Sequence, residues 1–264
     1  MAEHALALPH RAGRYWRVCA TAVCFGVFGL GGLLLRALAF PALRLAVRDP
    51  ARRARRARSV IHHTFRAFVG IMRSLGVISV EVRGVEKLQR EGLLILANHP
   101  SLIDVVLLMS LVRRADCIVK ASLARNPFTR GPVRAAGFVC NDSGAGLLHD
   151  CIGSLRAGNN MIIFPEGTRT PRSGAARLQR GAANVAVRGG VDVTPVRIRV
   201  TPPTLGKEDK WYRVPQRRAH FLIEVGDDMA VSRFTHTQAS EALAARRLTD
   251  HLADYFALET PRAA

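Results

Sequence analysis

The sequence predicts an α/β fold in which helices flank a mixed, largely parallel sheet. Short apolar segments typical of buried strands alternate along the chain with segments whose apolar residues recur at helical spacing. Hydrophobic residues make up 48% of the 264 positions, which is enough for the core of one large domain or two small ones.

Each expected element follows from a local pattern. Apolar residues at helical spacing predict a helix over residues 61–75, and residues 79–84 are expected to form a strand that ends in a turn. Further strands are expected at residues 93–98, 117–121, 137–141, 161–165, 193–200 and 220–226. Further helices are expected at residues 101–111, 147–155, 179–187 and 240–256, with a helix or turn at residues 127–134.

The amino-terminal part has a composition of its own. No charged residue occurs from Val18 to Leu35, and eighteen apolar residues are the lower limit for a membrane-spanning helix. Tyr15 and Trp16 lie where interfacial aromatic residues are found. A second apolar stretch, residues 37–47, is interrupted by Pro41. A cleaved signal peptide is the alternative, but no clear cleavage site follows, so we expect an uncleaved anchor that either spans the bilayer or dips into it.

The charge balance points to an acidic partner. The 39 Lys and Arg outnumber the 20 Asp and Glu, which gives a net charge of +19. The run ARRARRAR, residues 51–58, is interpreted as a juxtamembrane segment on anionic lipid, with a solvated linker as the alternative. Stacking aromatics are scarce, so no nucleic-acid partner is expected. The five cysteines lack the spacing of metal ligands, so we expect neither a metal nor a disulfide framework.

These observations divide the chain in two. Residues 1–78 form a membrane-anchoring helical and polybasic segment, and residues 79–264 form the α/β domain. Basic residues outnumber acidic ones more strongly after the apolar run than before it. By the positive-inside rule, we expect the α/β domain on the cytoplasmic side of a bacterial-type inner membrane.

Polar clusters follow two of the apolar strands. One is NHPSLID at residues 98–104, and the other is FPEGTR at residues 164–169. In open α/β sheets, ligands bind outside the carboxyl ends of the strands. If the two strands are parallel, both clusters lie on that edge of the sheet and form one site.

The first cluster suggests a general base. His99 and Asp104 are five positions apart, a spacing that does not place two residues on one face of a continuous helix. If His99 precedes the helix and Asp104 lies in its first turns, the bend in the chain brings them together. Asp104 then fixes one imidazole nitrogen and leaves the other to deprotonate a hydroxyl. The alternative is a capping carboxylate beside an unrelated histidine.

The second cluster suits a phosphate or polyol ligand. Gly167 permits a tight turn, and Arg169 offers a planar fork for a phosphate. Glu166 can orient that arginine or hydrogen-bond a polyol. The alternative is a surface turn with a local ion pair.

NHPSLID followed by FPEGTR resembles the glycerolipid acyltransferases, the lysophosphatidic acid acyltransferase (1-acylglycerol-3-phosphate acyltransferase) family. VKASLARNPF, which contains Lys120, resembles the segment between the two motifs. LQRGAANVA at residues 178–186 and VTPVRI at residues 193–198 resemble later blocks. The resemblance covers roughly residues 80–200, and both the order and the spacing of the motifs agree.

The resemblance implies a membrane-associated O-acyltransferase that uses no metal or other cofactor. His99, held by Asp104, would take the proton from an acceptor hydroxyl, whose oxygen attacks the thioester of acyl-CoA or acyl carrier protein. No covalent enzyme intermediate is implied, and the chain has no GxSxG motif of a serine hydrolase. The residues implied to bind the acceptor are Lys120, Glu166, Gly167, Thr168 and Arg169.

The sequence departs from the family at one block, which usually ends in an arginine that contacts the acceptor phosphate. Here residues 137–144 read GFVCNDSG, and Lys120 or Arg125 would have to compensate. The departure favours a lysophospholipid-like acceptor with another head group, an aminolipid, a glycolipid or a polyene-pigment lipid. An alternative from another class is a catalytically idle lipid-binding protein of the same fold.

Overall fold

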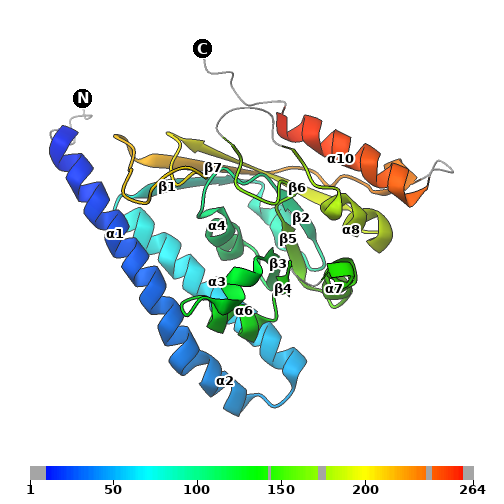
Figure 1. Ribbon diagram of the computed structural model, residues 1–264, viewed down its shortest axis with the longest axis horizontal. Helices are drawn as coiled ribbons and strands as arrows, with labels where there is room; N and C mark the ends of the chain where they lie inside the picture. Colours follow the sequence, from blue (N-terminus) through cyan, green and yellow to red (C-terminus); the bar gives the residue numbers. More distant parts are fainter. Residues whose placement is uncertain (1–9, 142–143, 172–176, 236–239, 258–264) are drawn as a thin grey trace.

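The computed structural model describes residues 10–141, 144–171, 177–235 and 240–257. A seven-stranded sheet forms its centre, with helices on both faces (Figure 1). The strands are β1 (Ile78–Arg83), β2 (Leu94–Ala97), β3 (Ala115–Val119), β4 (Val139–Cys140), β5 (Asn160–Ile163), β6 (Val193–Thr201) and β7 (Ala219–Val225). The longer helices are α1 (His10–Leu34), α2 (Phe40–Ala46), α3 (Pro50–Ser74), α4 (Asp104–Leu111), α6 (Arg130–Ala136), α7 (Leu147–Arg156), α8 (Gly181–Gly189) and α10 (Glu241–Ala257). Shorter helical turns are the π-helical η1 (Leu35–Ala39), η2 (Val85–Leu88), α5 (Ala121–Arg125), η3 (Gly144–Gly146) and α9 (Ser232–Thr235).

The sheet is mixed and largely parallel, as predicted. Its strand order is β1-β7-β6-β2-β5-β3-β4, and every neighbouring pair is parallel except β6 and β7. The central strand β2 lies between β6 and β5, with Leu96 opposite Ile163 of β5. Because β2 and β5 are parallel neighbours, the loops that follow them meet at one edge of the sheet.

Two apolar layers enclose the sheet. Ile95 and Ala97 of β2 pack into the core beneath α3 and α4, whereas Leu94 and Leu96 pack into the core beneath α7, α8 and α10. All four side chains are fully buried. A strand covered on both faces must be apolar at every position, which explains the uninterrupted apolar run.

The amino-terminal segment forms a long helical hairpin along one side of the domain (Figure 1). The sequence suggested that Pro41 interrupts the second apolar stretch, but the helix continues from α1 through η1 into α2, which contains Pro41. Proline lacks an N–H and crowds the carbonyl of the preceding turn, and the π-helical turn lies at that place. The stretch Gly13–Ala46 is long and apolar enough to cross a membrane.

The basic run ARRARRAR is helical, so its interpretation as a linker is wrong. It forms the start of α3, which begins at Pro50 rather than at residue 61. The Asp49 carboxylate accepts hydrogen bonds from the amides of Ala51 and Arg52. An aspartate N-cap followed by proline at the first helical position is a typical start signal.

Candidate active site

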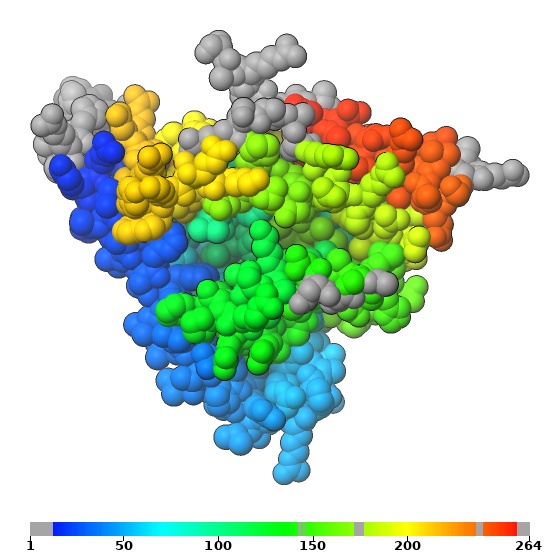
Figure 2. All heavy atoms as spheres, in the orientation of Figure 1, coloured from blue at the N-terminus to red at the C-terminus, as the bar shows by residue number. Residues whose placement is uncertain are grey.

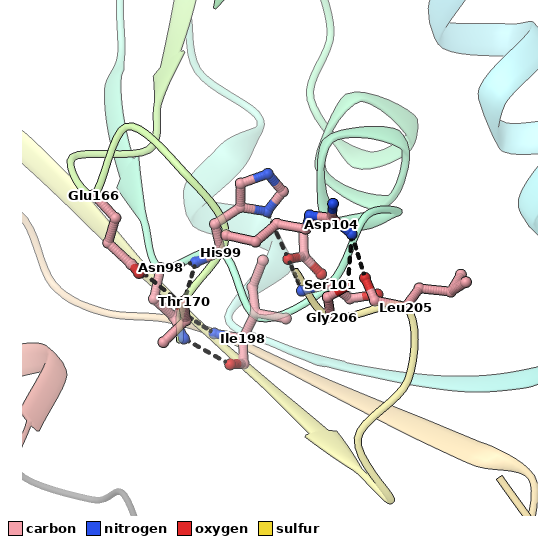
Figure 3. A network of polar contacts seen from close by, with 10 residues as sticks. Asn98, His99, Ser101, Asp104, Glu166, Thr170, Ile198, Leu205 and Gly206 are labelled. Carbon is pink, nitrogen blue, oxygen red and sulfur yellow. Dashed lines mark hydrogen bonds and ion pairs between the residues drawn. The ribbon is translucent and has the colours of Figure 1, made fainter. Parts of the chain in front are cut away.

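The two polar clusters lie side by side beyond the carboxyl ends of β2 and β5 (Figure 3). The Asn98 side chain donates to the carbonyl of Ile198 (2.9 Å) and accepts from its amide (2.7 Å), which ties the loop after β2 to β6. The amide of Thr170 donates to the His99 carbonyl at 2.7 Å. These bonds bring the loop after β5 against the backbone of His99.

His99 and Asp104 form the predicted dyad geometry. Asp104 Oδ2 lies 2.9 Å from His99 Nδ1, and the same oxygen accepts from the amide of Ser101 at 2.7 Å. The helix α4 begins at Asp104 and not at Ser101, so His99 lies outside the helix and the chain bends back between the two residues. Asp104 therefore combines a partner for the imidazole with a cap for the turn.

Electrostatics at the dyad follow from burial. The Asp104 side chain is completely buried, while His99 keeps 15% of its side-chain surface exposed. Burial raises the pKa of Asp104 to about 6, and the hydrogen bond from His99 opposes that rise. Because Nδ1 faces the carboxylate, Nε2 is the nitrogen left for a ligand. The imidazole stacks on Phe164 with ring centroids 4.3 Å apart, which restricts its rotation.

Glu166 supports the histidine from the other side. Its Oε1 accepts from the His99 amide (3.0 Å) and from the Thr170 hydroxyl (2.7 Å). The carboxylate is 94% buried, and burial raises the pKa of Glu166. The sequence suggested that this carboxylate orients Arg169 or binds a polyol. Its described hydrogen bonds go to the His99 amide and the Thr170 hydroxyl, and none of those described reaches Arg169.

The rest of the second cluster faces the space beside His99. Gly167 adopts a left-handed φ of +66°, as a tight turn requires, and its amide donates to the Phe164 carbonyl. Arg169 Nη1 donates to the carbonyls of Leu205 (3.0 Å) and Gly206 (2.7 Å). The arginine therefore holds the chain that follows β6 beside the site, in addition to any ligand role.

Lys120 and Asn141 line the same space. Lys120 is exposed and precedes the first residue of α5. The side chain of Asn141, where the sequence departs from the expected arginine, accepts from the Ala121 amide at 3.0 Å. The neighbouring positions Asp142 and Ser143 lie outside the described residues. Arg125 is exposed and is not among the residues that line the cavity.

A cavity of about 1170 Å³ connects the dyad to the amino-terminal helices. His99, Lys120, Gly167, Thr168 and Arg169 line its polar end. Its remaining walls are mainly apolar side chains of α1, α3, α4 and α6, including Phe28, Phe65, Val106 and Val133. Figure 2 shows this face of the molecule hollowed between α1, the chain after β6 and the region of α5 and α6.

Two contributions to the site were missed from the sequence. Thr170 clamps His99 by its backbone and by its hydroxyl, and Phe164 stacks on the imidazole. Phe164 is the first residue of FPEGTR and Thr170 follows its last residue, so their place in the motif was an available signal. Their roles depend on pairing between loops that are about 70 residues apart, which no local pattern reports.

Comparisons with known proteins agree with the geometry. Residues 79–199 match the family model described as Acyltransferase. The chain is 27% identical over 150 residues to the 1-acyl-sn-glycerol-3-phosphate acyltransferase of Pseudomonas aeruginosa, an alignment that covers 53% of this chain and 57% of that protein. A 1-acyl-sn-glycerol-3-phosphate acyltransferase of Chlamydomonas reinhardtii is 31% identical over 121 residues, which cover 43% of this chain and 36% of that protein. These alignments span about half or less of the relatives' length.

A solved structure shares the fold. The crystal structure of the 1-acyl-sn-glycerophosphate (LPA) acyltransferase PlsC from Thermotoga maritima superposes with a TM-score of 0.60. The superposition covers 97% of this chain and 100% of that chain at 20% sequence identity. The similarity therefore extends through the amino-terminal helices, which lie outside the match to the family model.

Proposed function

We propose that the protein, whose residues 79–199 match the Acyltransferase family model, transfers an acyl chain from a thioester donor to a hydroxyl of a lysophospholipid-like acceptor. The observation that carries this proposal is the hydrogen bond of 2.9 Å between His99 Nδ1 and the buried carboxylate of Asp104. It directs Nε2 toward the cavity as a base.

In the proposed reaction, the acceptor O–H donates to His99 Nε2. As its oxygen attacks the thioester carbonyl, the proton moves to Nε2, and the imidazolium is stabilised by the Asp104 carboxylate. The tetrahedral intermediate then collapses with cleavage of the C–S bond. The departing thiolate takes the proton from Nε2, so the products are the acylated acceptor and the free thiol of acyl-CoA or acyl carrier protein.

The acceptor head group is proposed to bind at the polar end of the cavity. Lys120 brings an exposed ammonium there, and Thr168 and Arg169 line the same cavity. Glu166 acts with Gly167 by shaping this wall. Asn141 supplies no charge in the block where the family usually has an arginine. This supports a head group other than the phosphate of lysophosphatidic acid.

Membrane association is proposed to run along α1 instead of across the bilayer. The helical segment contacts the rest of the structure near both ends: Trp16 Nε1 of α1 donates to the Leu75 carbonyl at the end of α3, and Arg36 of η1 donates to the Pro127 carbonyl. A segment held in this way does not cross a bilayer as an isolated span. From α1 to α2 it exposes large apolar residues, which suits burial in the interface: Val23, Val27, Leu30, Leu33, Leu34, Leu38 and Leu45.

The test is acyl transfer by purified wild type and His99→Ala. Acyl-CoA and acyl carrier protein serve as donors, and lysophosphatidic acid is compared with other lysolipids, an aminolipid and a glycolipid as acceptors. We expect transfer by wild type that falls by about 10²–10⁴-fold in the variant while vesicle binding is kept. Equal rates in both proteins would exclude His99 as the base. No transfer with any pair, with vesicle binding intact, would support the idle lipid-binding alternative.

A further inference from the structure

The loop between β6 and β7, residues 202–218, carries an exposed aromatic pair. Trp211 and Tyr212 are each 46% exposed, and their rings meet edge to face with centroids 5.8 Å apart. Tryptophan and tyrosine combine an apolar ring with a polar tip, a combination that is enriched at membrane–water interfaces. While the two rings are exposed to water, their apolar surface contributes little to stability.

The aromatic pair is joined to α1. The Trp211 ring lies 6.0 Å from the ring of Phe25, and the Arg17 guanidinium donates to the carbonyls of Pro215 (3.3 Å) and Gln216. Figure 2 shows the yellow spheres of this part of the chain directly against the blue spheres of α1. The loop therefore continues the apolar surface of α1.

Positive charge surrounds the aromatic pair. Within residues 202–218, five Lys and Arg stand against Glu208 and Asp209. Asp209 accepts from the Gly206 amide at 2.8 Å, so one carboxylate is engaged inside the loop. Lys210 Nζ lies 5.9 Å from the centroid of the Tyr212 ring. All five cations are exposed, but Arg218 donates to the carbonyls of Ile78 and Arg73, which leaves Lys207, Lys210, Arg213 and Arg217 for a ligand. Such a combination of rings and cations complements an anionic lipid surface.

We propose that residues 207–215 are a second membrane-contacting element, which binds anionic lipid and holds the cavity mouth at the level of the head groups. The proposal rests on the membrane association proposed above for α1. Lys207, Val214 and Pro215 line the same cavity as His99. A lipid acceptor in the leaflet that the loop contacts therefore reaches the dyad beside this loop without crossing water.

The two tryptophans of the chain provide a direct test. Trp16→Phe leaves Trp211 as the only fluorophore, and Trp211→Phe leaves Trp16 as a reference on α1. Each protein is mixed with phosphatidylglycerol–phosphatidylcholine vesicles whose acyl chains are brominated near the carbonyl end or near the methyl end. We expect Trp211 emission to shift to the blue and to be quenched more strongly by the shallow bromines.

The outcomes separate this inference from the proposed function. If the protein sediments with vesicles but Trp211 emission is neither shifted nor quenched, membrane association by α1 stands and the loop contact is wrong. That result would also favour a soluble acidic partner as the ligand of the basic loop. If neither variant sediments with vesicles, both the loop contact and the membrane proposal are wrong.

A charge variant adds a matched control. Arg213→Gln is expected to weaken binding to anionic vesicles by about fivefold and to leave binding to neutral vesicles unchanged. Arg246→Gln removes an exposed arginine from α10, which packs on the opposite face of the sheet. It should not change binding. An equal loss in both variants would indicate a general effect of net charge and would overturn the loop contact.

Discussion

Two aspartates, Asp104 and Asp116, are completely buried in the same domain, and burial raises the pKa of both. Asp104 accepts from His99, which lines the large cavity. Asp116 accepts from Arg58 (2.9 Å) and Ser154 (2.5 Å), and neither of these partners lines that cavity. Histidine exchanges a proton near neutral pH and arginine does not. The partner, more than the burial, decides whether a buried carboxylate serves chemistry or architecture.

The architectural pair has a definite position. Arg58 belongs to the basic run at the start of α3, and its side chain is 92% buried, whereas Arg55 and Arg56 are exposed. Through Asp116, it ties the amino-terminal hairpin to β3 of the sheet. The pair thus holds α3 against the sheet. The neighbouring helix α4 begins at Asp104.

The largest effect is expected from a substitution of Asp104, the aspartate that is paired with histidine. Asp104→Asn keeps the shape of the side chain but no longer stabilises an imidazolium or specifies the tautomer of His99. We expect kcat to fall by about 10²–10⁴-fold with little change in vesicle binding. Steady-state acyl transfer at saturating donor measures this. A variant that keeps more than half of the wild-type rate would show that Asp104 is only a cap for the turn.

The next largest effect is expected from a substitution that breaks the pair of Arg58 and Asp116. Arg58→Met leaves the Asp116 carboxylate buried without its cation, and we expect the free energy of unfolding to fall by about 3–5 kcal/mol. Denaturant unfolding in detergent measures this, with Arg55→Met as the control because Arg55 is exposed on the same run. The folded fraction should retain its acyl-transfer rate. Equal stability of the two variants would contradict the assigned role of the pair.

A smaller effect is expected from the clamp on His99. Thr170→Val keeps the size of the side chain and removes the hydroxyl that donates to Glu166. We expect kcat to fall roughly tenfold while KM changes little, because the imidazole is less well positioned. Thr249→Val on α10, which loses a hydroxyl bonded to the Ala245 carbonyl, is the control. Similar kinetics in the two variants would leave Thr170 no positioning role.

The smallest effect is a dependence on pH. Because the pKa of Asp104 is raised to about 6, its carboxylate is ionised above that pH and protonated below it. We expect kcat to be constant above the transition and to fall with decreasing pH, reaching about a tenth of the plateau one unit below. A profile of kcat from acid to neutral pH tests this. A rate that rises toward acid pH would contradict the direction.

Much of the fold was predictable because β2 and β5 are buried on both faces and are apolar except for Asn160 at the start of β5. Helices whose extent depends on contacts with residues far away in the sequence were not predictable. The first turns of α3 look like a polar linker in sequence, yet Arg58 belongs to the core because Asp116 lies opposite it. The helix likewise continues beyond η1 because Pro41 can be accommodated by a π-helical turn.

The site shows the same division. His99 and Asp104 were predictable because they are close in sequence and a bend was the only way to bring them together. Glu166 was predicted as a partner of Arg169 or of a polyol, but its contacts reach the backbone of His99. Arg169 bonds to the carbonyls of Leu205 and Gly206. These contacts follow from the packing of separate loops, which spacing within one motif does not encode.

The central claim is that Asp104 holds His99 with Nδ1 protonated and Nε2 free to act as the base. Nitrogen NMR of protein labelled at the histidine ring nitrogens, with the His99 signals assigned by their loss in His99→Gln, measures the tautomer directly. The dyad predicts that the neutral imidazole carries its proton on Nδ1 and none on Nε2, and that Asp104→Asn loses this preference. A His99 that carries its proton on Nε2 in the wild type would contradict the mechanism.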